Sequence, residues 1–224
     1  MTITITLCII IVTSLVSILG FNNQKIIDKL IFYPPAITEK KQWYRFFTCG
    51  LVHKDIPHLV FNMYALYVFG QGQAKTGAEF WFTLVFGDKG KWLYLIMYVL
   101  ALGVCLIPTF QKHKNNRYYR SLGASGAVSA IVFAFIILNP SAGVGLIFVP
   151  VYIPGFLFAL VYLIISYFLS KREGSAINHS AHIFGALFGM VFVLAVSPVF
   201  ADYSVIHSFI DSIKEFDYRK TFSY

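Results

Sequence analysis

The run GASGAVSAIVFAFIIL, residues 123–138, sets a small polar motif, Gly123-Ala124-Ser125-Gly126, at the head of an apolar segment that ends at Leu138. A second apolar run starts near His182, fifty-seven positions after Ser125. Polar and ionisable groups are costly inside a bilayer, so they are candidates for function when they occur there. We therefore interpret the chain as a membrane protein with reactive side chains at the heads of two apolar segments.

The composition excludes an ordinary soluble domain. Hydrophobic residues make up 58% of the 224 residues and charged residues only 12%, whereas a soluble domain is about 25% charged. The net charge of +8 comes from basic residues between the apolar runs, where they can meet lipid headgroups. No segment alternates basic and aromatic residues in the manner of a nucleic-acid-binding protein. We therefore expect the lipid bilayer as a partner and do not expect a nucleic acid.

Two further features narrow the class. Cys8, Cys49 and Cys105 are scattered without a CxxC spacing, so neither a zinc site nor a redox pair is expected. The apolar stretch from Thr2 to Gly20 lacks a basic start and an A-x-A cleavage site, which favours a retained first transmembrane helix over a secretory signal.

We expect an all-α polytopic membrane protein, because a helix satisfies its own backbone hydrogen bonds in lipid. A spanning helix needs about 20 apolar residues, within a range of about 17 to 25. Six candidates, some of them short, fill a membrane domain over residues 1–200: Ile3–Phe21, His58–Gly70, Trp92–Phe110, Ser125–Leu138, Pro154–Leu169 and Ala181–Phe200.

The connecting segments are unequal. The first loop, residues 22–57, is long and contains an aromatic stretch, Trp43 to Phe47, of the kind that lies at the headgroup level. Residues 78–86 are apolar but too short to span, so we expect an interfacial segment there. The tail, residues 201–224, is expected to be flexible or an amphipathic helix on the membrane surface, since apolar residues recur at helical spacing from Val205 to Phe216.

Two polar clusters carry donors and a nucleophile. His58 and Asn62 are four residues apart, so they share a helix face and could together stabilise an oxyanion. A helix–helix hydrogen bond is the structural alternative.

Ser125 stands between Gly123 and Gly126, which permit a tight turn and close substrate approach at a helix start with free N–H groups. Its structural alternative is a small packing face with an N-capping serine.

The third cluster is HIFGALFG, residues 182–189. Gly185 and Gly189 form a GxxxG face, which lets another helix approach closely, and His182 lies one turn before Gly185. A helix packed on this face would therefore lie within reach of His182, whose imidazole can take a serine proton and return it to a leaving amine. A structural histidine at a helix interface is the alternative.

Taken together and in this order, the clusters resemble the rhomboid family of intramembrane serine proteases. The family pattern has a Trp-Arg pair in the first loop, HxxxN on the second helix, GxSG at the fourth and HxxGxxxG on the sixth. The corresponding residues here are Trp43 and Arg45, which Tyr44 separates, His58 and Asn62, Gly123 to Gly126, and His182 to Gly189, while His53 fits a loop histidine common in the family. The resemblance runs from Ile3 to Phe200 and implies a six-helix bundle.

The resemblance also implies a Ser-His dyad. Ser125 would be the nucleophile and His182 the general base and acid. The oxyanion hole would consist of His58, Asn62 and the backbone N–H of Ser125. Packing roles would fall to Gly123, Gly126, Gly185, Gly189, Arg45 and His53. The substrate would be a transmembrane helix of another protein, and no metal or organic cofactor is implied.

Two features depart from the family pattern. Ser129 occupies the position, four residues after Ser125, where family members often have an aromatic that packs on the catalytic histidine. The family topology places the active site outside, so we expect the plasma membrane with the site towards the outer side. Twelve Lys and Arg would then lie in outer loops and six inside, contrary to the positive-inside rule. We follow the motifs, because loop charge is only a statistical bias.

Two other functions compete with proteolysis. A catalytically silent relative would bind transmembrane helices for quality control, but such relatives usually lack the dyad that this chain keeps. An unrelated channel or carrier would have a polar site at mid-depth, with charged or broken helices there. The apolar runs show little of either.

Overall fold

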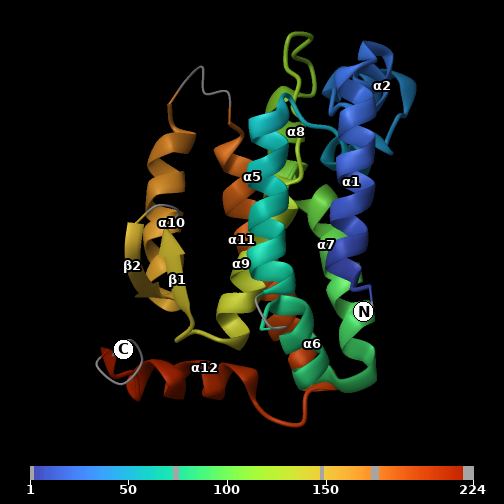
Figure 1. Ribbon diagram of the computed structural model, residues 1–224. Coiled ribbons are helices and arrows are strands. Elements are labelled where there is room, and N and C mark those ends of the chain that lie inside the picture. The colour runs from blue at the N-terminus through green and yellow to red at the C-terminus, as the bar shows by residue number, and fades with distance from the viewer. Residues whose placement is uncertain (1–2, 73–75, 147–148, 173–176, 219–224) are drawn as a thin grey trace.

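The computed structural model describes residues 3–72, 76–146, 149–172 and 177–218. In chain order the elements are α1 (Ile5–Phe21), α2 (Gln24–Leu30), α3 (Pro34–Lys40), α4 (Arg45–Thr48), the 3-10 helix η1 (Cys49–Leu51), α5 (Ile56–Leu66), the π-helical η2 (Tyr67–Gln71), α6 (Ala78–Phe86), the 3-10 helix η4 (Gly87–Lys89), α7 (Gly90–Val104), α8 (Ile107–His113), α9 (Ser125–Leu138), β1 (Gly143–Leu146), β2 (Val149–Pro154), α10 (Gly155–Ser170), α11 (His179–Phe200) and α12 (Val205–Lys214). The long helices run between two ends (Figure 1): α2 and α8 lie at one, here called the α8 end, and α12 lies across the other, the α12 end.

The six ranges predicted to span all fall on helical segments of this bundle, but Trp92–Phe110 covers both α7 and α8, and His58–Gly70 runs from α5 into η2. Among the described residues, the stretches Ala78–His113 and His179–Phe200 are long and apolar enough to cross a membrane, by length and composition. Three shorter helices, α1, α9 and α10, are also apolar. The chain is therefore mostly helical, and the number of spans stays a prediction.

The all-α prediction missed one hairpin. β1 and β2 pair antiparallel, with Gly143 opposite Pro154 and Val144 opposite Ile153. The segment between α9 and α10, residues 139–154, contains three prolines, which disfavour a helix, and it is rich in valine and glycine. Pairing satisfies the backbone polar groups of the two strands, which would otherwise lack partners away from water.

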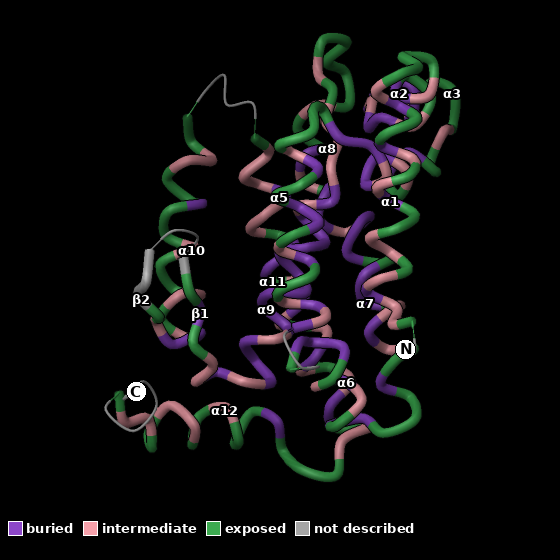
Figure 2. Tube along the Cα trace, in the orientation of Figure 1, coloured by how far each residue is buried: buried purple, intermediate pink, exposed green. Residues whose placement is uncertain are grey.

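Helix α9 forms the centre of the bundle. All of its residues are buried except Ser125 and Phe135, which are half-buried, and the buried colour in Figure 2 concentrates along this helix and its neighbours. A helix that is apolar on every side is expected only where other elements surround it. The sequence 126–138, without a single charged residue, therefore marks the core helix.

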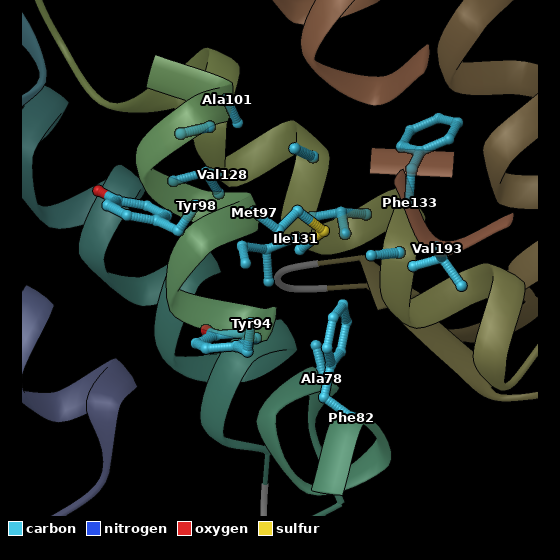
Figure 3. Close-up of a cluster of buried hydrophobic side chains, with 14 of the residues drawn as sticks. Ala78, Phe82, Tyr94, Met97, Tyr98, Ala101, Val128, Ile131, Phe133 and Val193 are labelled. Atoms are coloured by element: carbon cyan, nitrogen blue, oxygen red, sulfur yellow. The ribbon is translucent and has the colours of Figure 1, made fainter. Parts of the chain in front are cut away.

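The main core lies where α6 and α7 pack against α9. Figure 3 shows Phe82, Tyr94, Met97 and Ile131 gathered there, and all four are fully buried. The segment 78–86 therefore packs one face on the core, and its location at the membrane interface stays a prediction. α6 is short, but it continues through η4 into α7 and presents one apolar face to the core.

The outer surface of the bundle is strongly apolar. On α10 the exposed large hydrophobic residues are Leu157, Leu160, Val161, Ile164, Ile165, Tyr167 and Phe168. A soluble monomer rarely exposes a contiguous apolar patch beyond a few hundred Å², so this surface fits contact with lipid. The tail forms α12, which Ser204 caps and which leaves Ile206 and Ile210 exposed, while residues 219–224 lie outside the described part.

A buried carboxyl group ties the start of α1 to α6. Glu79, which is 6% exposed, accepts hydrogen bonds from the backbone N–H of Ile5 (2.9 Å), from that of Thr6 (2.8 Å) and from the Thr6 hydroxyl (2.8 Å). The Thr6 hydroxyl also contacts the Tyr94 hydroxyl at 2.8 Å. The first N–H groups of a helix lack partners within the helix, so Glu79 satisfies donors that lipid would leave unpaired.

We expect Glu79→Leu to lower the free energy of unfolding by about 2–3 kcal/mol, because it leaves the buried N–H of Thr6 and the half-buried N–H of Ile5 without an acceptor. Thermal unfolding in detergent micelles measures the change. Asp88→Leu is the matched control, since Asp88 is an exposed acid that follows the same helix. Equal losses for the two variants would contradict the capping role.

Candidate active site

Two glycines bring α9 and α11 into backbone contact. The buried residues of α11 include Ala181, Gly185, Gly189 and Val193, which recur every four residues and so form one face. A Cβ at Gly185 would lie 2.0 Å from the Gly126 carbonyl oxygen, and one at Gly189 would lie 2.2 Å from the Ala130 carbonyl oxygen. Only glycine fits at these two positions, as the GxxxG pattern predicts.

This contact places the predicted serine and histidine together. The Nε2 atom of His182 lies 2.7 Å from the Oγ atom of Ser125. Ser125 is the first residue of α9, and Ala124, which makes no side-chain capping bond, is the N-cap. The alternative of an N-capping serine is therefore wrong, and the Ser125 hydroxyl is committed to the imidazole.

The start of α11 is held by a pair that sequence reasoning missed. The Asn178 side chain caps α11 by accepting from the Ala181 N–H at 3.1 Å. The same amide exchanges hydrogen bonds of 3.1 and 3.2 Å with the Thr109 hydroxyl on α8. The asparagine four residues before His182 was the available signal. This pair fixes the helix turn that carries His182.

A cavity of about 1180 Å³ opens at the α8 end, and Ser125, His182, His58 and Asn62 all line it. His58 and Asn62 lie on α5, where the Asn62 amide donates to the His58 carbonyl oxygen at 2.9 Å. The four residues predicted to act together thus share one cavity. No group of three His, Cys, Asp or Glu suited to a metal ion occurs in the part of the chain that the structure describes.

The turn before Ser125 has no room for a side chain. Gly123 has φ +110°, and a Cβ there would lie 2.9 Å from the His58 Nε2 atom. Its N–H donates to the Cys49 carbonyl oxygen at 2.9 Å. On the other side of Ser125, a Cβ at Gly126 would lie 2.5 Å from the Cys105 sulfur. Both flanking glycines are therefore required by space, and Gly123 also by its backbone angle.

His53 connects the first loop, α1 and this turn. It is 1% exposed, and its Nε2 accepts from the Ala124 N–H at 3.4 Å. Its Nδ1–H then donates to the Ser17 hydroxyl (2.9 Å), which itself donates to the Leu51 carbonyl oxygen (2.9 Å). Burial, and to a lesser degree the neighbouring His58, lower the pKa of His53 to about 3, so the ring is neutral.

Arg45 organises the first loop rather than the cavity. It is 7% exposed and donates to the carbonyl oxygens of Asp28 (2.9 Å) and Ile31 (2.7 Å) and to the Gln42 side chain (2.6 Å). The loop in turn pairs with the segment before α9, since Phe32 and Ser121 exchange backbone hydrogen bonds of 3.0 and 3.1 Å. The first loop thereby holds Ser125 in place from outside its own helix.

Ser129 has an aromatic partner from another helix. Its hydroxyl donates to the Ser125 carbonyl oxygen at 2.9 Å and lies 2.7 Å from the hydroxyl of Tyr162 on α10. Because the Ser129 hydrogen is used on Ser125, Tyr162 is the donor of the second bond. The Tyr162 ring packs on Phe133, with centroids 5.3 Å apart. Sequence reasoning missed Tyr162, whose only signal is a hydroxyl within an apolar run.

A sequence model of the rhomboid domain matches residues 40–199 of this chain. The chain belongs to the rhomboid family. The match covers the helices that carry the four cavity residues, together with part of the first loop. The family resemblance inferred from the motifs is therefore confirmed, and with it a rhomboid-type membrane fold.

Curated relatives carry rhomboid names and match part of the chain. "RHOMBOID-like protein 12, mitochondrial" of Arabidopsis thaliana is 36% identical over 146 residues, which cover 62% of this chain and 42% of the relative. "Presenilin-associated rhomboid-like protein, mitochondrial" of Mus musculus is 29% identical over 146 residues, which cover 63% of this chain and 35% of the relative. The match thus spans less than half the length of either relative.

Gly185→Ala and Gly189→Ala should each lower the free energy of unfolding by about 1–3 kcal/mol, because the new Cβ meets backbone and α11 must move away from α9. Thermal unfolding in micelles measures the loss. Gly103→Ala on α7 is the control, since its Cβ would meet only the Phe47 side chain at 3.3 Å. Unchanged stability at both 185 and 189 would contradict the close contact.

His53 should make the protein less stable in mild acid. The unfolded chain takes up a proton near the ordinary pKa of 6.5, whereas the folded one does not until about 3. His53 therefore does not reduce the free energy of unfolding well above pH 6.5. Below that pH the free energy of unfolding falls, by about 2 kcal/mol between pH 7 and 5. His53→Gln should remove this part of the pH dependence, and His207→Gln, at an exposed histidine, should keep it. Unfolding measured at both pH values tests this; an equal decline in all three proteins would assign it to another group.

Proposed function

We propose that this chain is an intramembrane serine endopeptidase, which hydrolyses a peptide bond in or near the transmembrane helix of a membrane-protein substrate. The observation that carries the proposal is the 2.7 Å contact between Ser125 Oγ and His182 Nε2 inside a large cavity. Rhomboid-family proteins are generally intramembrane serine proteases, which supports the same activity. The proposal assigns catalytic roles to Ser125 and His182 and needs no metal or organic cofactor.

In the first half of the proposed reaction, Ser125 Oγ bonds to the carbonyl carbon of the substrate while its proton passes to His182 Nε2. The C–N bond then breaks, and His182 gives that proton to the leaving amine. An acyl-Ser125 ester remains. In the second half, water adds to the ester carbon and loses a proton to His182. The ester bond breaks, the proton returns to Ser125, and a carboxylic acid leaves.

The negative oxygen of each tetrahedral intermediate needs hydrogen-bond donors. Asn62 uses one amide hydrogen on the His58 carbonyl oxygen and has a second one to offer. The Lys54 N–H faces His58 Nδ1 at 3.5 Å, which favours the tautomer with its hydrogen on Nε2. The Ser125 N–H lies in the first turn of α9, where it has no acceptor within the helix. We propose these three as the oxyanion hole, in which one donor is worth about 10²–10³ in kcat.

The chain is an integral membrane protein in this proposal, with all six predicted helices spanning, a membrane domain over residues 1–200 and a surface tail over 201–224. Two membranes compete as its location. The family topology favours the plasma membrane with the cavity outside, whereas the names of the relatives favour a mitochondrial membrane. The position of a tagged chain in fractionated cells distinguishes them.

Substrate cleavage tests the dyad directly. The purified chain in lipid vesicles is given a labelled transmembrane substrate, and the rate is followed by gel. Ser125→Ala and His182→Ala should each reduce cleavage by at least about 10³-fold, because neither group works alone. Ser208→Ala and His207→Ala, at exposed residues of α12, are the controls and should cleave normally.

Unchanged cleavage by Ser125→Ala would refute the dyad. If the chain cleaves no substrate, a serine-reactive fluorophosphonate probe decides the alternative. Failure to label Ser125, under conditions that label an active protease, would favour the catalytically silent relative that only binds transmembrane helices.

A further inference from the structure

The mouth of the catalytic cavity is lined by positive charge. Its charged lining residues are Lys54, Lys112, Arg120, Lys171 and Arg172. All five are exposed to solvent, and none of the described lining residues is an Asp or Glu. The cations come from three separate segments of the chain, so the charge is a property of the mouth and not of one loop.

The positive charge of the described residues is concentrated at this end. The described segments at the α8 end, residues 22–57, 111–124, 171–172 and 177–178, hold twelve Lys and Arg against three Asp and Glu. The other described residues hold three Lys and Arg against six Asp and Glu. The excess of positive charge in the described part therefore lies in the segments around the cavity.

No described acid forms an ion pair with a cation of the mouth. The ion pairs among described residues are Arg117–Glu39 and Lys214–Asp211, and neither includes a lining cation. Arg120 and Lys171 instead lie over the rings of Tyr33 (4.8 Å) and Tyr167 (4.3 Å), contacts that leave their charge uncompensated.

One described acid lies beside a lining cation in the sequence. Asp55 follows Lys54, and its carboxyl oxygen accepts from the His58 N–H at 2.8 Å as the cap of α5. The neutral N–H leaves the charge of Asp55 in place, so Asp55 offsets one of the five cations. A net positive field therefore remains at the mouth and acts on whatever enters the cavity.

We propose that the substrate segment that enters this mouth is acidic, so that the chain prefers transmembrane helices with Asp or Glu just outside their apolar span on the cavity side. This inference rests on the proposed protease function. The five cations line the same cavity as Ser125 and His182, so their field acts on a chain that reaches those residues.

Three substrates test the preference. They share one transmembrane segment and differ only in the flanking residues on the cavity side, which are Glu and Asp, Gln and Asn, or Lys. The full chain is reconstituted in neutral phosphatidylcholine vesicles. We expect kcat/KM for the acidic substrate to exceed that for the neutral one by about tenfold at low salt, the lower end for electrostatic steering. The ratio should approach one at high salt, where exposed charges are screened.

A triple variant, Lys112→Gln with Lys171→Gln and Arg172→Gln, should lose most of this preference. The matched control is Lys89→Gln with Lys91→Gln and Lys214→Gln, which removes three exposed cations from the α12 end and should keep it. All six residues are on the surface, and the salt dependence of the unaltered chain gives the same answer without any substitution.

The outcomes separate the two proposals. Equal cleavage of the three substrates, above the level of Ser125→Ala, would overturn the acidic preference and leave the protease intact. No cleavage of any substrate above that level, together with no fluorophosphonate label on Ser125, would overturn the protease itself. If the triple variant lowers cleavage of all three substrates alike, and only in vesicles that contain phosphatidylglycerol, the cations bind headgroups and the acidic preference is wrong.

Discussion

The close contact of α9 and α11 determines both the fold and the geometry of the site. Gly185 faces the carbonyl oxygen of Gly126, the residue directly after Ser125, and His182 lies one turn earlier on α11. The separation of the two helices therefore determines whether Ser125 Oγ and His182 Nε2 lie within hydrogen-bond distance. Lipid offers helices no hydrophobic reason to associate, so tight packing of small residues has to supply the attraction. Stability and reactive geometry consequently have the same origin.

That contact fixes the separation of the helices but not the turn that presents the serine. Ser125 is the first residue of its helix, where the backbone lacks internal partners. The first loop instead holds the segment just before Ser125: Phe32 pairs with Ser121, the Cys49 carbonyl oxygen accepts from the Gly123 N–H, and the His53 ring accepts from the Ala124 N–H. A neutral His53 is needed here, because only an unprotonated Nε2 can accept the Ala124 N–H. The long first loop thus fixes the position of the residues that directly precede Ser125.

Local patterns in the sequence predicted most of this arrangement, but they did not predict contacts between residues that lie far apart in the chain. Apolar runs located the helices, and the spacing of Gly185 and Gly189 identified the face that meets α9, because both are periodic along one helix. The β1–β2 hairpin has no such period. Two side-chain contacts join distant residues: Glu79 and Thr6 are 73 positions apart, and Tyr162 and Ser129 are 33 positions apart. The sequence around one partner does not indicate which residue the other is. An isolated acid or hydroxyl in an apolar run signals that a partner exists, and only the fold identifies it.

The topology also makes the cavity favour negative charge without help from basic side chains. His58, Ser125 and His182 each lie in the first turn or so of their helices, and α5, α9 and α11 all begin at the cavity. A helix start carries about half a positive charge from its aligned peptide dipoles, an effect that fades within one turn. Three such starts therefore act on the reacting atoms, whereas the exposed Lys and Arg act at the mouth and are screened by salt. Stabilisation of a developing oxyanion and attraction of an acidic segment are thus carried by different groups, and replacing the cations should alter which substrate enters while leaving the field at Ser125 largely in place.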